Sequence, residues 1–231
     1  AFSILVGNGS LDTASAEVLA ILCAIEIDAT LQGIASYIQR DVNRRRLTLG
    51  TLDTLFPADH PGSLCVGPES PLVRSALVVV EPTGPWSSRE ISVNGTVIWA
   101  LQGDMASDPD LPSAATLTSF DVPVDGAPLT LVVGEDRQRR IEAATRATAG
   151  TRFLVTPSPT SEPEWSAVVR EATIRGVGII VEADNEIAAD ARRWIERAEH
   201  LPWSVSSRLE QAVRDLPRRP WIEVTADDNL A

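Results

Sequence analysis

The sequence predicts an α/β protein with two domains, a mainly helical one followed by a parallel sheet covered by helices. Before residue 107, three segments carry apolar residues at helical spacing, and a β-hairpin pattern follows them. After residue 119, five short apolar runs alternate with amphipathic segments, which is typical of βαβ units and a largely parallel sheet. Residues 107–119 contain two prolines and no strong period. We therefore predict domains at 1–106 and 120–231, joined by a linker at 107–119.

The first domain is expected to contain helices at residues 15–26, 30–44 and 48–56, the last of them stopped by Pro57. Residues 71–75 can form one further helical turn. Residues 77–81 and 90–93 have strand composition, and the polar stretch between them predicts a hairpin. Residues 94–102 can return as a helix capped by Asn94. Three helices followed by a hairpin is the order of a winged helix.

The second domain alternates regularly between strands and helices. Strands are expected at residues 129–133, 152–156, 177–182, 202–206 and 220–224, and helices at 137–148, 164–175, 187–199 and 207–215. Four tryptophans fall on these elements among apolar neighbours, so they are predicted to lie in the core: Trp165, Trp194, Trp203 and Trp221.

Composition and charge narrow the classes of function. The 231 residues are 44% hydrophobic and 23% charged, as in soluble globular proteins, and carry a net charge of -12. This charge disfavours broad binding to nucleic acid or to an anionic membrane. The longest apolar run, residues 18–25, is too short to span a bilayer. We expect a cytoplasmic protein without membrane contact and, because its only methionine is Met105, a fragment excised from a longer chain.

Residues 134–141 have the outline of a phosphate-binding loop without its binding residues. A P-loop reads G-x-x-x-x-G-K-[ST], in which the lysine and hydroxyl hold the γ-phosphate and Mg²⁺. Here Gly134 is present, but Arg139 stands at the second glycine, Arg140 at the lysine and Ile141 at the hydroxyl residue. All 20 basic residues of the chain are arginines, so no lysine can take this role anywhere. An ordinary turn between a strand and a helix remains an equal alternative.

Two arginine clusters could bind phosphate. Residues 137, 139 and 140 lie at a predicted helix N-terminus, although the acids at 135 and 136 argue against an anion there. Arg44, Arg45 and Arg46 lie just before the helix that would read DNA in a winged helix. The alternative is a solvated helix end whose cations complement the helix dipole. Residues 48–56 offer no Arg, Lys, Asn or Gln to base edges, so nucleic-acid binding is not favoured. The two histidines are far apart in sequence, and we propose no metal site.

The first domain resembles a known family. The segments 17–26, 37–46, 70–82 and 98–103 resemble the variant winged-helix domain at the N-terminus of certain bacterial AAA+ ATPases, some of which are encoded with contractile injection systems. The resemblance covers most of residues 15–106. It implies that residues 129–224 are the large subdomain of a degenerate AAA module, a P-loop-NTPase-like parallel αβα sandwich whose helical lid is missing.

This resemblance implies that the chain itself is inactive. Residues 134–141 match the Walker A loop, and residues 179–183 match the Walker B strand. There Glu182 replaces the metal-binding Asp and Ala183 replaces the Glu that would activate water. ATP and Mg²⁺ are expected as cofactors of the parent protein and not of this chain. Ser206 and Ser207 fall near a sensor position, although a helix cap is the commoner role for such serines.

The expected function is therefore protein recognition and assembly, with ATP hydrolysis by a module outside this chain. The expected partners are other protein subunits or a protein substrate, within a possible ring of identical subunits. Three alternatives stay open: nucleotide binding without hydrolysis at Gly134 and Arg140, nucleic-acid binding through Arg44–Arg46, and hydrolysis by Glu182 with Asp184 as a shifted acid.

Overall fold

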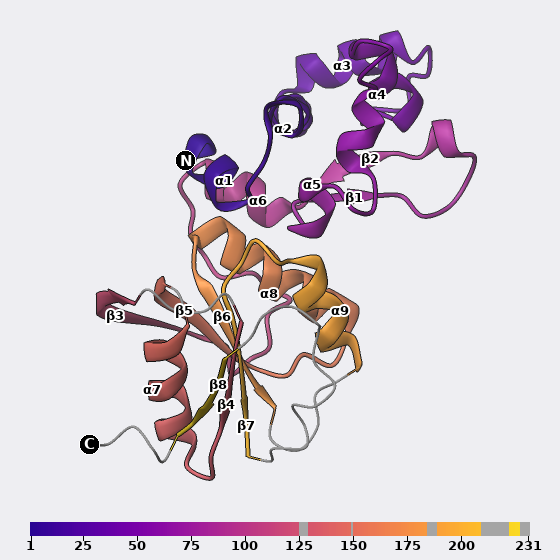
Figure 1. Ribbon diagram of the computed structural model, residues 1–231. Coiled ribbons are helices and arrows are strands. Elements are labelled where there is room, and N and C mark those ends of the chain that lie inside the picture. Colours follow the sequence, from indigo (N-terminus) through magenta and orange to yellow (C-terminus); the bar gives the residue numbers. More distant parts are fainter. Residues whose placement is uncertain (125–128, 149, 184–188, 209–221, 227–231) are drawn as a thin grey trace. The chain divides into compact units, whose positions relative to one another are not determined.

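The computed structural model describes residues 1–124, 129–148, 150–183, 189–208 and 222–226 (Figure 1). The chain divides into two compact units, Ala1–Ser107 and Asp108–Ala231.

The first unit is mainly helical and carries one small hairpin. Its helices are α1 (Phe2–Asn8), α2 (Thr13–Ile27), α3 (Ala29–Ile38), α4 (Leu49–Leu55), α5 (Pro71–Arg74) and α6 (Gly95–Leu101), with 3₁₀ turns at Gly62–Val66 and Trp86–Ser88. Short polar side chains cap most of these helices. Asp12 accepts the backbone N–H of Ser15 at 2.7 Å to start α2, and Asn94 accepts that of Thr96 at 2.9 Å to start α6. The predicted cap of α6 is thereby confirmed.

The hairpin pairs β1 (Val78–Val80) with β2 (Ile91–Val93) in antiparallel fashion. A third segment joins its edge: Thr48 forms an isolated bridge with Glu90, and the backbone N–H of Ile91 donates to the Leu47 carbonyl at 2.9 Å. The segment between α3 and α4 is thus fixed to the hairpin.

Two predictions for this unit need correction. Helix α3 ends at Ile38 and not at Arg44, because Arg40 takes a left-handed backbone conformation with φ +53° that ends the helix. The backbone N–H of Asp41 then bonds back to the Ser36 carbonyl at 3.1 Å. Helix α1 was not predicted at all.

The second unit is built on a six-stranded, mostly parallel sheet. Its strands are β3 (Thr116–Val124), β4 (Leu129–Val133), β5 (Gly150–Pro157), β6 (Gly178–Ala183), β7 (Trp203–Ser207) and β8 (Ile222–Thr225), in the order β3-β5-β6-β7-β4-β8. Strand β3 pairs with β5 in antiparallel fashion, and all other neighbours are parallel. The five predicted strands are confirmed with small shifts of their ends. The helix predicted at 207–215 lies almost wholly outside the described residues.

Residues 107–119 do not form the predicted linker. Strand β3 begins at Thr116, and the side chain of Asp108 is fully buried against α8 (Glu162–Arg175). Arg170 donates to the Asp108 carboxylate at 2.7 Å, and the Asp108 backbone N–H donates to Glu171 at 3.3 Å. Proline content suggested a linker, but buried charged groups must be paired, and this pairing ties the segment to the second unit.

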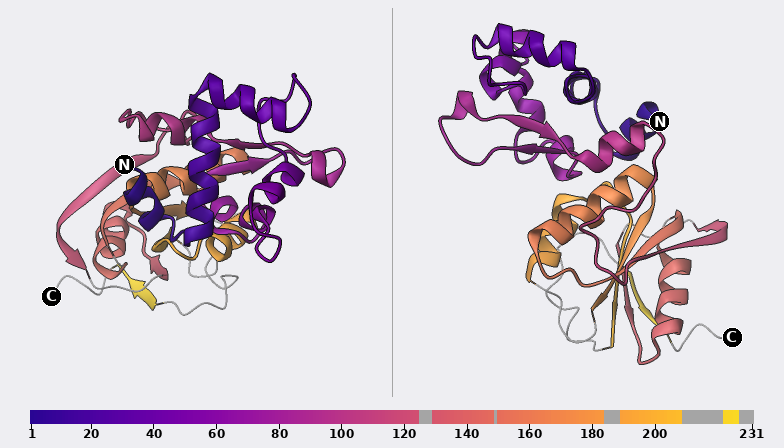
Figure 2. Two further views of the ribbon diagram at one scale, coloured as in Figure 1. Left: turned by 90° about the horizontal axis from the view of Figure 1, so that it is seen from above. Right: turned by 180° about the vertical axis from the view of Figure 1, so that it is seen from behind.

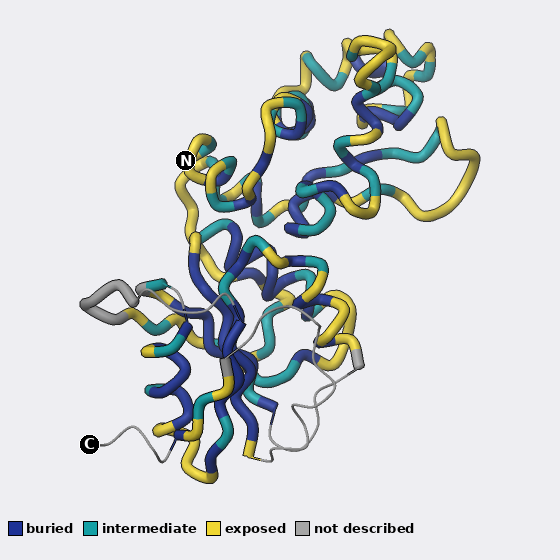
Figure 3. The backbone as a smooth tube through the Cα atoms, viewed as in Figure 1, coloured by how far each residue is buried: buried dark blue, intermediate teal, exposed yellow. Residues whose placement is uncertain are grey.

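Helices cover both faces of the sheet (Figures 1 and 2). One face packs on α7 (Arg137–Ala147), with Val132, Phe153, Val155 and Ile180 facing it. The other face carries the larger core and packs on α8 and α9 (Ala189–Arg197). The predicted core tryptophans Trp165, Trp194 and Trp203 are fully buried there, and Trp221 lies outside the described residues. Figure 3 shows that most residues along the central strands of the sheet are buried.

Candidate functional site

The predicted Walker residues come together at the carboxyl edge of the sheet. Strands β4, β6 and β7 are parallel, so the turn after β4 and the ends of β6 and β7 lie at the same edge. Strand β7 stands between the other two, and its Ser206 is in register with Val132 on one side and Glu182 on the other. In the strand order, β5 lies on one side of the neighbouring pair β4 and β7, and β8 lies on the other side. The connections that follow β4 and β7 therefore run in opposite directions along the sheet. Such a switch point is where open α/β sheets bind ligands.

The buried side chain of Arg140 occupies this switch point. Only 1% of the residue is exposed. Its Nε donates to Ser206 Oγ at 2.9 Å, and its Nη1 donates to the carbonyl oxygens of Gly134 at 2.7 Å and Glu135 at 3.1 Å. A P-loop turns backbone N–H groups toward a phosphate. Here two backbone carbonyl groups turn toward a cation that the chain itself supplies.

The first turn of α7 is also capped by a side chain of the protein. Asp136 caps the helix, and its carboxylate accepts the backbone N–H of Arg139 at 2.8 Å. A carboxylate therefore stands where the helix dipole would attract a phosphate. The Arg139 side chain is exposed, and Ile141 is buried in the core beneath α7.

Glu182 is held by a guanidinium group from the first turn of α7. Arg137 contacts it through two nitrogen atoms, with Nε to Oε1 and Nη2 to Oε2 both at 2.6 Å. This is the bidentate geometry in which arginine binds carboxylates most strongly. Sequence reasoning proposed Arg137 as a phosphate ligand and missed this pair. The pair joins the first residue of α7 to the end of β6, and local sequence pattern does not record a partner so far away in the chain. Ala183 is buried, and Asp184 lies outside the described residues.

Gly134 is needed for a close approach between the loop and the end of β8. A Cβ atom at this position would lie 2.7 Å from the Cβ of Ala226. The Gly134 backbone N–H donates to the Ser207 carbonyl at 3.2 Å, so this N–H points into the sheet and not toward a ligand.

These residues do not fit a magnesium nucleotide. A phosphate at the switch point would meet two carbonyl oxygens, and it would have to displace a buried guanidinium group that is already hydrogen-bonded. The carboxylate nearest to a metal position, Glu182, is paired with Arg137. Within the described residues, no group of three or more His, Cys, Asp or Glu side chains is placed to hold a metal ion.

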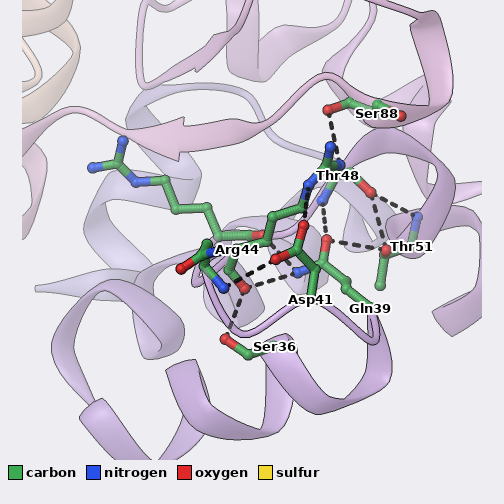
Figure 4. A network of polar contacts seen from close by, with 9 residues as sticks. Ser36, Gln39, Asp41, Arg44, Thr48, Thr51 and Ser88 are labelled. Carbon is green, nitrogen blue, oxygen red and sulfur yellow. Dashed lines mark hydrogen bonds and ion pairs between the residues drawn. The ribbon is translucent and has the colours of Figure 1, made fainter.

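The second arginine cluster lies far away in the sequence, in the loop between α3 and α4. Arg44 pairs with Asp41 at 3.1 Å and donates to the Ser88 carbonyl at 3.4 Å (Figure 4). Arg46 pairs with Glu26 at 2.9 Å. Arg45 is exposed. Because α3 ends at Ile38, the cluster is not at the end of a helix, and the alternative that its cations complement a helix dipole is wrong.

Helix α4 was the expected recognition helix, but its polar groups bond within the unit. Thr51 Oγ1 donates to Gln39 Oε1 at 3.2 Å, and the Asp53 carboxylate accepts the Ser63 backbone N–H at 2.8 Å. Leu49 and Leu52 are buried. These contacts leave this helix little to present to base edges.

Comparison of the chain with protein-family models, curated proteins and solved structures finds no match in any of the three. Among the described residues, no single helix is both long and apolar enough to cross a membrane. Any assignment of function must therefore come from the geometry of the chain itself.

Proposed function

We propose that this chain is a non-catalytic portion of an AAA+ ATPase that acts in protein recognition and assembly, while a module outside the chain hydrolyses ATP. The observation that carries this proposal is Arg140, which fills the ligand position of the sheet with a side chain of the protein. A domain whose ligand position is filled by its own side chain is suited to a structural role and to binding other proteins.

The order of the strands supports the resemblance. The strand before the loop (β4) and the strand with Glu182 (β6) are separated by β7, and β8 lies on the far side of β4. AAA+ modules also have a strand inserted between their Walker A and Walker B strands. In the first unit, α2 to α4 followed by the β1–β2 hairpin has the order of the winged-helix domain that precedes such modules. A sheet order is a property of the fold, so function still needs an experiment.

The experiment is a thermal unfolding series of the 231-residue chain with ATP and Mg²⁺. A ligand present at a hundredfold over its Kd would stabilise the protein by about 2.7 kcal/mol. We expect no shift up to millimolar ATP. Turnover of ATP should also stay at the level of the buffer.

A saturable shift would contradict the proposal and favour the binder without hydrolysis. The matched variants are Arg140→Ala and Arg139→Ala, since Arg140 is buried at the switch point and Arg139 is exposed on the same helix. Loss of the shift in the first variant alone would place the nucleotide at this loop. Nucleic-acid binding through Arg44–Arg46 has less support, because Arg44 and Arg46 are already in ion pairs.

A further inference from the structure

Strand β3 forms an open edge of the sheet in the second unit. It is the outermost strand in the order β3-β5-β6-β7-β4-β8 and pairs with β5 on its inner side (Figure 1). Within the described residues, no backbone group bonds to the outer side of Thr116–Ser119. The outer N–H and C=O groups of these residues therefore face solvent in a row. The ligand that matches such a row, donor to acceptor, is another extended peptide backbone.

The two edges of this sheet differ in how they are protected against pairing. Strand β8 at the other edge has four residues, and its Glu223 is exposed. Short length and a charged side chain are usual protections of an edge strand. Residues 116–120 of β3 contain neither a charge nor a proline, whereas Asp121 and Pro123 follow in its second half. The first half of β3 is therefore an unprotected edge.

A groove runs beside this edge, between β3 and the first two turns of α7. Thr116 and Thr118 line it from the strand, and Gln138 and Glu142 line it from the helix, around a volume of about 380 Å³. Thr116 is in register with Val155, which faces α7, so the groove lies on the α7 side of the sheet. A strand added outside β3 would place every second side chain beside this groove.

The charge of the groove favours a basic side chain on such a strand. Arg137 also lines the groove, but it is bound to Glu182 through two contacts of 2.6 Å, so its charge is matched within the protein. Glu142 lies 4.0 Å from Arg146, and 44% and 61% of these two side chains are exposed. A pair of that length and exposure contributes little. Glu142 therefore leaves the groove with a negative charge that a lysine or arginine of the partner would complement.

The opposite side of β3 favours an apolar neighbour. Side chains alternate along a strand, so Leu117 points away from α7. This side chain is 40% exposed. Apolar residues that lie opposite each other on neighbouring strands stabilise a sheet. The strand that fits this edge thus carries basic side chains on its α7 side and apolar side chains on its other side.

We propose that residues 116–119 bind an extended segment of a partner protein, which adds a strand to the sheet and carries alternating basic and apolar side chains. This inference rests on the proposed role in protein recognition and names the kind of partner and its site. The ATP titration does not involve β3 and tests the proposed function separately. Failure of the peptide experiment below would exclude this edge as the site, while the response to ATP would be unchanged.

The experiment uses a peptide of alternating lysine and valine, about eight residues long, and the 231-residue chain labelled with ¹⁵N. Salt of about 0.15 M screens attraction between distant charges. We expect saturable binding with a Kd on the order of 100 µM and shifts of the backbone amide signals of residues 116–119. A peptide with the same lysines and valines in two separate blocks should bind at least tenfold more weakly. No saturable binding of the alternating peptide up to about 1 mM would overturn the proposal.

Two changes to the peptide separate backbone pairing from charge. N-methylation of its central amides removes the backbone donors and keeps the side chains, so binding should be lost. Replacement of its lysines by glutamates should weaken binding at least tenfold, because the groove presents Glu142. Equal binding of the N-methylated peptide would show a contact without strand pairing. Equal binding of the glutamate peptide would show that charge does not select the partner, and either result contradicts the proposal.

Variants of the chain place the peptide on one edge of the sheet. Leu117→Lys adds a charge to the unprotected edge and should weaken binding at least tenfold, whereas Thr225→Lys, at an exposed position of β8, should not. Glu142→Gln should weaken binding about two- to fivefold. Equal binding by the two lysine variants would exclude β3 as the site. Sedimentation velocity examines the chain alone: a dimer that Leu117→Lys abolishes would identify a second copy as the occupant and overturn the proposal.

Discussion

At the scale of single residues, the fate of the candidate site depends on where one guanidinium group points. The sequence identifies Arg140 as standing at a lysine position and excludes any lysine in the chain. It does not reveal that the side chain bends back to the carbonyl groups of Gly134 and Glu135. Backbone orientation in a turn depends on its tertiary partners, and local pattern does not record them. The Arg137–Glu182 pair escaped prediction for the same reason, since it joins residues 45 positions apart.

The first prediction concerns the stability that Arg140 provides. Arg140→Met keeps much of the side-chain volume but leaves the carbonyl groups of Gly134 and Glu135 and the Ser206 hydroxyl without this donor. Each unmade bond to a charged group costs about 1.5–3 kcal/mol, and part of the gap can be filled by water. We expect the free energy of unfolding in urea to fall by about 3 kcal/mol.

Arg139→Met is the matched control for this measurement. It changes an exposed residue of the same helix and should alter the free energy of unfolding by less than about 0.5 kcal/mol. Equal changes of the free energy of unfolding in the two variants would mean that the buried guanidinium group of Arg140 does not stabilise the fold.

At the scale of elements, the repeating strands and helices of the second unit were predictable, but the edge strand β3 was not. Buried parallel strands such as β4 and β6 can be recognised as short apolar runs, because both of their faces are covered. Strand β3 carries Thr116, Thr118 and Ser119 among its first residues and pairs only with β5 among the described strands, so its pattern is that of a loop. In the first unit, α3 was predictable as a helix. The side that α3 turns toward the protein was not predictable. Hydrogen bonds of Gln32, Ser36 and Gln39 turn the polar side inward, whereas the apolar pattern predicted the opposite side to face the core.

The second prediction concerns the first turn of α8. Thr160 donates its backbone N–H and its hydroxyl to Glu164 Oε2, at 2.7 and 3.0 Å. These bonds favour the ionised carboxylate and lower the pKa of Glu164 from its ordinary value of 4.5, the backbone bond contributing most. Since the folded pKa is depressed, the stabilisation is present above pH 4.5 and is lost as the pH falls below it.

An NMR titration of the Glu164 side chain measures this pKa. Thr160→Val removes the hydroxyl bond and keeps the backbone bond, so the pKa should rise part of the way toward 4.5. A Glu164 titration that does not move in Thr160→Val would show that the hydroxyl bond is absent in solution.

At the scale of the whole molecule, the division into two units was foreseen and its boundary was not. The sequence placed a linker at 107–119, but the second unit begins at Asp108. A single buried pair explains the difference, since Asp108 and Arg170 are nearly inaccessible and lie 2.7 Å apart. Prolines and small polar residues resemble a linker in composition, and only the long-range partner shows that the segment is packed.

The third prediction follows from this boundary. A fragment of residues 108–231 should unfold cooperatively in urea, with far-UV circular dichroism as the signal. A fragment of residues 120–231 lacks Asp108 and the paired start of β3, so Arg170 is left buried without its carboxylate. Loss of one partner of a buried pair costs about 3–5 kcal/mol, a large share of a domain's stability. We expect the shorter fragment to lose its cooperative transition.

Indistinguishable transitions in the two fragments would contradict this boundary and restore the linker. Asp108→Asn in the longer fragment separates the charge from the chain length, because it removes one carboxylate and leaves β3 in place. This variant should keep a cooperative transition, at a lower urea concentration than the unsubstituted 108–231 fragment.

The inward carbonyl groups around Arg140 limit what could be built at this position by changing side chains alone. Rewriting positions 139–141 as Gly, Lys and Thr would introduce the letters of a Walker loop, yet Gly134 and Glu135 would still direct carbonyl lone pairs at the place where an anion would have to sit. The peptide backbone of the turn would have to be rotated before a phosphate could be accepted. A protein engineer who wanted a phosphate site here would therefore do better to replace the whole turn than to change it residue by residue.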